Sequence, residues 1–264
     1  MIRRPIGIFD SGIGGLTVLN RLLEAMPGEN FVYFGDTARL PYGSKSKDAI
    51  VHYSQQNARF LLSRKVKMII VACNSASSNA LTSLKRNFDV PVFGVIEPAI
   101  RGIKKGFGKI GLIGTYATVE SGAYQSLIIR SFPGIKIFPR ACPLFVPFVE
   151  EGMANSNIAL EVIRYYLEPM KRKNIDALIL ACTHYPVLAK KLGSYFGKST
   201  ALIDPAAELA REIKVFVRER GISNPSGGKI DFFLSDIPRN FGALAGHFLK
   251  REIGRIKKID IERY

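Results

Sequence analysis

The hydrophobic residues of this chain of 264 residues form short apolar runs separated by longer amphipathic segments. The apolar runs show little polar alternation and predict strands at 6–9, 31–34, 68–72, 92–96, 110–113, 135–138, 177–181 and 200–203. The segments between them have helical periodicity and predict helices at 15–26, 47–64, 77–87, 120–131, 156–172, 187–196 and 205–220. This alternation predicts an α/β fold, and Val/Ile/Leu-rich strands indicate mainly parallel sheets flanked by helices on both faces.

Three short segments occur twice, in the same order and at nearly constant separation. The pairs are IGIFDS at 6–11 with IGLIGT at 110–115, IIVACNS at 69–75 with LILACTH at 178–184, and VIEPA at 95–99 with LIDPA at 202–206. Together they indicate two similar lobes related by internal duplication, with a cleft between them. We expect lobe one to comprise residues 1–97 and lobe two residues 98–207. Residues 208–264 form no third copy, and we expect them to pack back onto lobe one.

Composition narrows the class of protein. The chain is 47% apolar and 23% charged, as in a globular protein. It has no apolar run of signal-peptide or membrane-spanning length, so we expect a cytoplasmic protein without a membrane partner. Its three cysteines form no Cys-x-x-Cys pair, which argues against a disulfide framework or a zinc ribbon. With only three histidines, we also expect no metal site.

The net charge of +16 raises the possibility of a nucleic-acid partner. The excess of basic over acidic side chains is 12 to 7 in residues 1–97, 14 to 7 in 98–207 and 12 to 8 in 208–264. Because the excess is spread along the chain, a solvated surface is the simpler interpretation, and nucleic acid is not expected as the main partner. The charge favours the approach of acidic small molecules at low salt.

Chemically useful residues follow several of the predicted strands. In open α/β sheets, ligands bind beyond the carboxyl ends of the strands. Candidate segments there are 10–11, 41–44 and 73–75 in lobe one, and 115–118 and 182–184 in lobe two. If the lobes face each other, Cys73 and Cys182 lie on opposite sides of one cleft. Cys142 has no such neighbours and is expected to be a small buried hydrophobic residue.

The pair of thiols suggests chemistry that a single thiol cannot perform. One thiol can remove a proton from one face of a carbon while the other delivers a proton to the opposite face. A helix start close behind each cysteine predicts a lowered thiol pKa. Asp10 and His184 have no ionisable counterpart in the other lobe and are sensible acid/base helpers. The structural alternatives are a helix cap for Asp10 and a satisfied core histidine for His184. Glu150 is a weaker candidate, since it can equally be a carboxylate at a helix start.

The glycine-rich segment at 10–17, DSGIGGLT, resembles a phosphate-binding turn but lacks the Lys-Ser/Thr of a P-loop and the spacing of a dinucleotide fingerprint. Its backbone amides could hold a carboxylate instead. No nucleotide cofactor is therefore expected.

The segments IGIFDSGIGGLTVL, GDTARLPYG, ACNSAS, GVIEPA, ACPLFVPFVEEG and LILACTHYP resemble the signature segments of the glutamate racemases. These enzymes belong to the cofactor-independent aspartate/glutamate racemase superfamily. The resemblance extends from about residue 5 to residue 210. It implies two α/β lobes with the active site between them, no cofactor, a homodimer and the supply of D-glutamate for peptidoglycan. Ser75 departs from the usual Thr but keeps the hydroxyl.

The resemblance also implies roles for individual residues. Cys182 would take the α-proton of L-glutamate and Cys73 that of D-glutamate, assisted by Asp10 and His184, with Glu150 near His184. The residues that would bind the substrate are Asp10, Ser11, Tyr42, Gly43, Asn74, Ser75, Thr115, Thr118, Thr183 and His184.

Two other functions stay open from the sequence. One is racemisation of aspartate or another acidic amino acid, although the Cys182-Thr183-His184 triplet favours glutamate, because aspartate racemases more often have Cys-Thr-Glu. The other is a secondary role in binding nucleic acid or regulating DNA gyrase, prompted by the positive charge.

Overall fold

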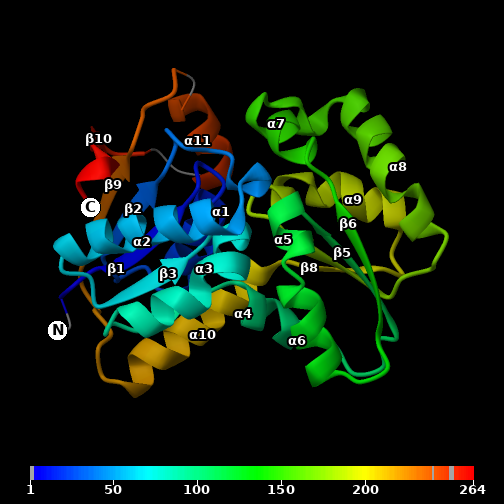
Figure 1. Cartoon of the computed structure of the whole chain (residues 1–264), viewed down its shortest axis with the longest axis horizontal. Helices are drawn as coiled ribbons and strands as arrows, with labels where there is room; N and C mark the ends of the chain where they lie inside the picture. Colours follow the sequence, from blue (N-terminus) through cyan, green and yellow to red (C-terminus); the bar gives the residue numbers. More distant parts are fainter. Residues whose placement is uncertain (1–2, 240, 250–252) are drawn as a thin grey trace.

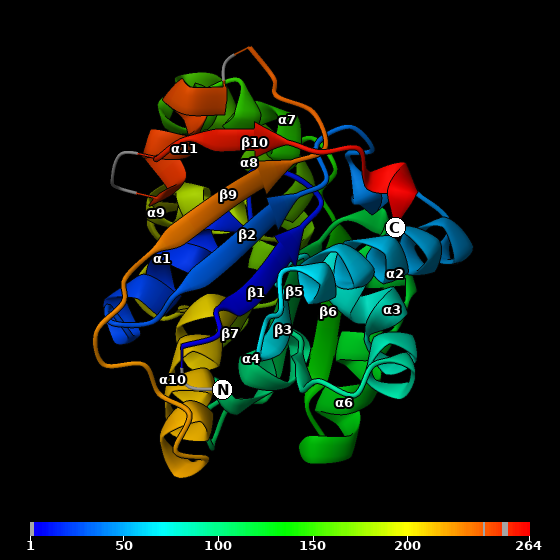
Figure 2. The same ribbon diagram turned by 90° about the vertical axis from the view of Figure 1, so that its left-hand side faces the viewer.

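Two parallel sheets organise the chain, whose computed structural model describes residues 3–239, 241–249 and 253–264 (Figure 1). The six-stranded sheet has the order β10-β9-β2-β1-β3-β4 (Figure 2). Its strands are β1 (Ile6–Asp10), β2 (Phe31–Gly35), β3 (Met68–Val71), β4 (Val92–Phe93), β9 (Ile230–Leu234) and β10 (Ile256–Lys258). The four-stranded sheet has the order β6-β5-β7-β8, from β5 (Lys109–Gly114), β6 (Lys136–Ala141), β7 (Ala177–Ala181) and β8 (Ala201–Ile203). The predicted fold class is confirmed.

The order β2-β1-β3-β4 in one sheet corresponds to β6-β5-β7-β8 in the other, strand for strand. This agrees with the sequence repeat, in which β1 matches β5 and β3 matches β7. The C-terminal strand β9 pairs in parallel with β2 and so extends the six-stranded sheet. That pairing supports the assignment of residues 208–264 to lobe one, although the lobe boundaries themselves stay a prediction.

Helices cover both faces of the sheets. They are α1 (Leu16–Ala25), α2 (Lys47–Ser63), α3 (Asn74–Asn87), α4 (Ile96–Arg101), α5 (Tyr116–Glu120), α6 (Ala123–Ser131), α7 (Phe145–Glu150), α8 (Asn157–Lys171), α9 (Ala189–Phe196), α10 (Pro205–Glu219) and α11 (Phe241–Leu249). Short 3₁₀ turns are η1 (Tyr42–Ser44), η2 (Met153–Asn155), η3 (Tyr185–Leu188) and η4 (Ile261–Arg263). Figure 2 shows α1 and α10 on one face of the six-stranded sheet and α2 and α3 on the other.

Alternating strand residues fill separate cores on the two faces of the six-stranded sheet. Ile8 of β1 joins the core that includes Leu19 of α1, whereas its neighbour Phe9 joins the core that includes Phe60 of α2. Because successive side chains of a strand point to opposite faces, a strand between two cores must be apolar throughout. This packing explains the continuous apolar runs in the sequence.

Some predicted elements differ from the structure. Helix α3 begins at Asn74 rather than residue 77, because Cys73 already has the extended backbone of a helix cap. The helix predicted at 120–131 begins at Ala123 as α6, and Gly122, with φ of +68°, separates it from α5, which was not predicted. The strand predicted at 92–96 ends at Phe93, and α4 starts at Ile96. Strands β9 and β10 were not predicted.

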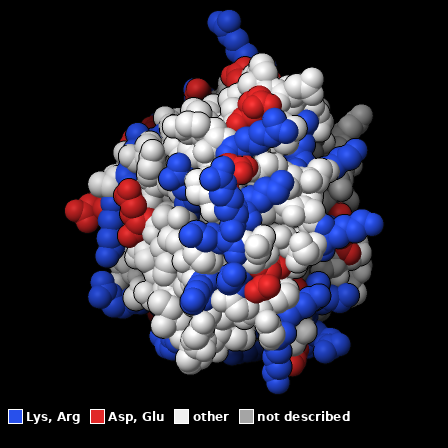
Figure 3. Space-filling model, turned by 90° about the vertical axis from the view of Figure 1, so that its right-hand side faces the viewer, with Lys and Arg blue, Asp and Glu red and all other residues white. Residues whose placement is uncertain are grey.

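One face of the molecule is rich in basic side chains. Figure 3 shows the face on the side of the four-stranded sheet, where Lys and Arg side chains predominate and acidic groups lie between them. Several of these charges are paired, for example Arg172 with Glu168 and Arg164 with Glu161. Among the described residues, no helix is long and apolar enough to cross a membrane.

Candidate active site

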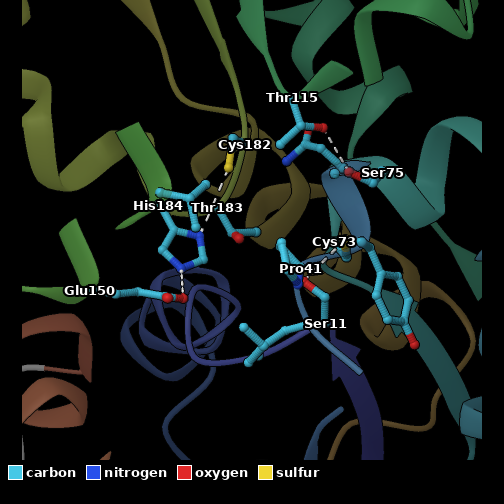
Figure 4. A pocket seen from close by; sticks show the side chains of 15 residues that line it. Ser11, Pro41, Cys73, Ser75, Thr115, Glu150, Cys182, Thr183 and His184 are labelled. Atoms are coloured by element: carbon cyan, nitrogen blue, oxygen red, sulfur yellow. Dashed lines mark hydrogen bonds and ion pairs between the residues drawn. The ribbon is translucent and has the colours of Figure 1, made fainter. Parts of the chain in front are cut away.

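A pocket lies where the carboxyl ends of strands from both sheets meet (Figure 4). The six-stranded side contributes Ser11 and Gly12 after β1, Leu40 to Gly43 after β2, and Cys73 to Ser75 after β3. The four-stranded side contributes Thr115 after β5, Val146 and Glu150 of α7, and Cys182 to His184 after β7. The repeat thus places equivalent strand ends against each other across one pocket.

The two cysteines of the repeat line this pocket, and all three cysteines of the chain are free and buried. Cys73 caps α3 and Cys182 directly follows β7. In Figure 4, Cys182 lies with Thr183 and His184 on one side of the pocket, whereas Cys73 lies with Ser11 and Pro41 on the other. Cys142 does not line it and is fully buried in the core, as its neighbours predicted.

Three side chains form a line on the four-stranded side. Nδ1 of His184 lies 3.9 Å from Sγ of Cys182, and Nε2 lies 2.9 Å from Oε1 of Glu150. Burial alone would lower the pKa of His184, but the hydrogen bonds with Cys182 and Glu150 raise it to about 10. His184 is therefore an imidazolium at neutral pH and places a positive charge beside the Cys182 sulfur.

Cys73 has a different environment. Its Sγ–H donates to Oγ of Ser11 at 3.7 Å. Burial and, to a smaller extent, the nearby Asp10 carboxylate raise the pKa of the Cys73 thiol to about 12. The lowered pKa expected from the helix start is therefore wrong for Cys73, because desolvation outweighs the amides at the start of α3. At neutral pH Cys73 is a protonated thiol, ready to donate.

Asp10 lies behind the pocket wall and is fully buried. Its Oδ2 accepts from the Gly12 amide at 3.0 Å, and its Oδ1 accepts from the Thr183 hydroxyl at 3.5 Å. Burial raises the pKa of this carboxyl, partly offset by the charge of His184. Asp10 thus holds one pocket residue from each side of the site.

Three hydroxyl groups form a second contact between the two sides. Oγ of Ser75 lies 2.9 Å from Oγ1 of Thr115 and 3.4 Å from Oγ1 of Thr118, and the two threonine oxygens are 3.1 Å apart. Ser75 and Thr115 line the pocket, whereas Thr118 is fully buried behind them. Thr118 and Asp10 are the two predicted site residues that the structure places outside the lining.

Tyr42 lines the pocket without offering its hydroxyl to it. The hydroxyl donates to Oδ2 of Asp36, and Asn57 donates to it at 3.0 Å. Tyr42 therefore presents only its ring and backbone to a ligand in the pocket. Gly43, the next residue, packs so closely that an added Cβ would lie 2.5 Å from Cβ of Thr115.

Sequence reasoning did not place Leu40 and Val146 in the site, and it considered Gly12 only as part of the glycine-rich segment at 10–17. These residues contribute backbone or apolar surface and carry no chemical signature. Pro41 was in a candidate strand-end segment, although no role was assigned to it. Among the described residues, no cluster of three or more His, Cys, Asp or Glu side chains could hold a metal ion.

The family model for Asp/Glu/hydantoin racemases matches residues 12–213. Glutamate racemase from Thermus thermophilus is 46% identical over 98% of both chains, and that from Geobacter metallireducens is 41% identical over 98% of this chain and 97% of its own. The crystal structure of glutamate racemase from Francisella tularensis in complex with D-glutamate has a TM-score of 0.95, 35% identity and full coverage of both chains. The chain therefore belongs to the Asp/Glu/hydantoin racemase family and, within it, to the glutamate racemases.

Proposed function

We propose that this protein interconverts L- and D-glutamate without a cofactor, with Cys73 and Cys182 as the two acid/base residues. The observation that carries the mechanism is the placement of both thiols in one pocket, at equivalent strand ends of the two sheets. The full-length similarity to glutamate racemases supports glutamate as the substrate.

Two proton transfers account for the reaction. The Cys182 thiolate takes the α-proton of L-glutamate, so that an S–H bond forms and the C–H electron pair stays on the carbon. The Cys73 thiol then gives its proton to the opposite face of that carbon, which yields D-glutamate and a Cys73 thiolate. Starting from D-glutamate, the same steps run in reverse. The protonated state of Cys73 matches the resting state needed for the L-to-D direction.

The charges around the pocket suit this chemistry. The imidazolium of His184 lies beside the sulfur that must carry negative charge when it acts as a base. The α-carbanion and the substrate carboxylates need donors in a site shielded from water. Hydroxyl groups of Ser11, Ser75 and Thr115 lie at the pocket wall and can supply such donors.

Substitution of each cysteine tests the assignment. We expect Cys73→Ala and Cys182→Ala each to reduce racemisation, followed by circular dichroism of glutamate, by roughly 10³-fold or more, because each removes a proton carrier from one face. Cys142→Ala removes a buried thiol outside the pocket and serves as the control. If either pocket variant keeps wild-type activity, the two-thiol mechanism is wrong.

The substrate range needs a separate measurement. Turnover of L-aspartate should be far below that of L-glutamate in the same assay. If the protein prefers aspartate, then aspartate rather than glutamate is its substrate. The proposed roles of the two thiols would not change.

We also propose that the product serves peptidoglycan synthesis in the cytoplasm. An enzyme that racemises glutamate can supply the D-glutamate that such a cell wall contains. Expression of the chain should restore growth of a bacterial strain that requires D-glutamate, and expression of Cys182→Ala should not. Growth restored equally by that variant would contradict this role.

A homodimer is the proposed assembly. Leu144, Ile158 and Tyr165 have large side chains that are 45%, 54% and 72% exposed. Covering such residues with a second copy would bury apolar surface. Light scattering coupled to size exclusion should give twice the mass of the 29.2 kDa chain. A monomer at micromolar concentration would exclude the dimer.

A further inference from the structure

Tyr124 contacts the pocket wall from behind. The residue lies in the first turn of α6 and is fully buried, and its hydroxyl donates to Oδ1 of Asn74 at 2.6 Å. Asn74 is the first residue of α3 and lines the pocket. Because α6 follows the four-stranded sheet's β5 and α3 follows the six-stranded sheet's β3, this hydrogen bond joins the two sides of the site.

The bond determines which end of the Asn74 amide faces a ligand. An asparagine amide offers an acceptor oxygen at one end and a donor NH₂ at the other. Burial raises the pKa of Tyr124, so its hydroxyl keeps its proton and acts as a donor to the oxygen. Within the described part of the chain, Nδ2 of Asn74 has no hydrogen-bond partner. Nδ2 keeps some solvent-accessible surface.

Asn74 itself is only 4% exposed, and the pocket is the space that it lines. An N–H group that opens onto the pocket donates to water when the pocket is empty, so a ligand that displaces this water has to supply an acceptor in its place. A carboxylate oxygen is such an acceptor, whereas the ammonium group of an amino acid is not.

We propose that Tyr124 is a positioning residue, which holds the Asn74 amide with its N–H groups toward the bound amino acid so that Asn74 donates to a substrate carboxylate. The inference rests on the proposed function and adds a residue that does not touch the substrate. Without the Tyr124 hydroxyl, the amide can turn by half a rotation and present its oxygen to the same carboxylate. Binding would then be weakened for both enantiomers.

Tyr124→Phe tests this role because it removes the hydroxyl and keeps the ring. We expect the KM for both enantiomers of glutamate to rise about tenfold, with a much smaller change in kcat. The matched control is Tyr195→Phe, which removes an equally short hydrogen bond, 2.6 Å to Glu168, outside the pocket. It should leave KM unchanged. A Tyr124→Phe enzyme with wild-type KM, or with a loss in kcat alone, would overturn the proposal.

A double-mutant cycle separates positioning from general stability. If Tyr124 acts through Asn74, adding Tyr124→Phe to Asn74→Ala should change KM no further. Independent, multiplicative effects of the two substitutions would show that the hydroxyl only stabilises the fold. Thermal unfolding of each variant reports that structural contribution directly.

Asn74→Asp tests the direction of the hydrogen bond to the ligand. The tyrosine can still donate to one carboxylate oxygen, but the second oxygen would replace the donor nitrogen. We expect glutamate to bind more weakly than it does to Asn74→Ala, because two carboxylates would then face each other. Equal or tighter binding would mean that Asn74 accepts from the substrate ammonium. A wild-type protein that does not racemise glutamate would instead contradict the proposed function.

Discussion

His184 and Glu150 show how neighbouring residues set the charge of a buried side chain. The 2.9 Å contact between Nε2 and Oε1 is one of the two hydrogen bonds that overcome the effect of burial on His184. The histidine without this partner would lose part of the stabilisation of its charged form. The charge of His184 should therefore depend on Glu150.

Glu150→Gln should lower the pKa of His184 from its value of about 10, because a neutral amide no longer favours the imidazolium. Nitrogen-15 chemical shifts of the imidazole, followed against pH, measure this change. Glu151→Gln at the exposed neighbouring position provides the control and should leave the titration where it was. An unchanged pKa in Glu150→Gln would show that this contact does not maintain the charge.

Stability should fall as the pH rises through the titration of His184. Its pKa in the folded protein, about 10, lies above the unfolded value of about 6.5. The stabilisation that the charged form contributes is therefore complete below pH ~6.5 and is lost as the pH approaches 10. Urea unfolding at pH 6.5 and pH 10 should show a larger decrease in the free energy of unfolding for wild type than for His184→Asn. Equal decreases would contradict the assignment.

The sequence predicted which residues line the site better than it predicted whether their side chains are protonated. It singled out Cys73 because of its place after a strand, and the structure puts that residue in the pocket. It could not show that burial and Asp10 keep the thiol protonated, since both depend on side chains distant in sequence. It also could not show that the Tyr42 hydroxyl bonds to Asp36, because that contact depends on the conformation of the loop between them.

The elements η1 and α5 approach each other across the pocket, and Gly43 allows this approach. An added Cβ would lie 2.5 Å from Cβ and 2.6 Å from Cγ2 of Thr115, closer than carbon atoms pack. Gly43→Ala should therefore force the two elements apart and reduce kcat/KM by roughly tenfold or more. Steady-state kinetics with both enantiomers measures the loss.

Gly193→Ala is the matched control for that substitution. Gly193 lies within α9, and its added Cβ would meet only Cδ1 of Leu202, at an ordinary 3.8 Å. Alanine in a helix interior is favoured over glycine by about 0.5–1 kcal/mol, so this variant should be fully active and slightly more stable. If Gly43→Ala behaves in the same way, the close approach is not needed for activity.

Helices with long, regular patterns were predictable, whereas several short elements were not. The amphipathic periods of α2, α8 and α10 gave boundaries within a few residues of those observed. In contrast, α4 has six residues and β10 has three, too few to produce a period. Helix α6 starts at Ala123 rather than at residue 120, because Gly122 has a left-handed backbone that the apolar pattern does not show.

On the scale of the whole molecule, Arg39 connects the site to the C-terminal segment. Its guanidinium contacts Asp36, Gln56, Asn57 and Glu262, and Ser235 after β9 donates to the other oxygen of Asp36. Asp36 is fully buried and also accepts from the Tyr42 hydroxyl. The loop that carries Tyr42 and Gly43 is thus fixed by residues from both ends of the chain.

Arg39→Met should destabilise the protein by about 3–5 kcal/mol, because it leaves the buried carboxylate of Asp36 without its cationic partner. Arg21→Met is the control, since Arg21 and its partner Glu24 are 44% and 50% exposed and such pairs contribute about 0–1 kcal/mol. Chemical denaturation compares the two variants. A cost for Arg39→Met no larger than that for Arg21→Met would mean that Asp36 does not depend on Arg39.

The repeat in the sequence predicted the paired sheets, since matched segments became β1 with β5 and β3 with β7. The same repeat led to the expectation that two cysteines share a pocket. The residues that close the pocket without matching the repeat, such as Leu40 and Val146, could be found only in three dimensions.

The most direct test of two-thiol racemisation is the reaction of L-glutamate in deuterium oxide, stopped early and analysed by mass spectrometry after separation of the enantiomers. Cys73 exchanges its proton with solvent before it donates, so each D-glutamate formed should carry one α-deuterium. The remaining L-glutamate should carry almost none, because Cys182 would hold the abstracted proton on the other face. D-Glutamate without α-deuterium would contradict proton delivery by a second group and therefore the central claim.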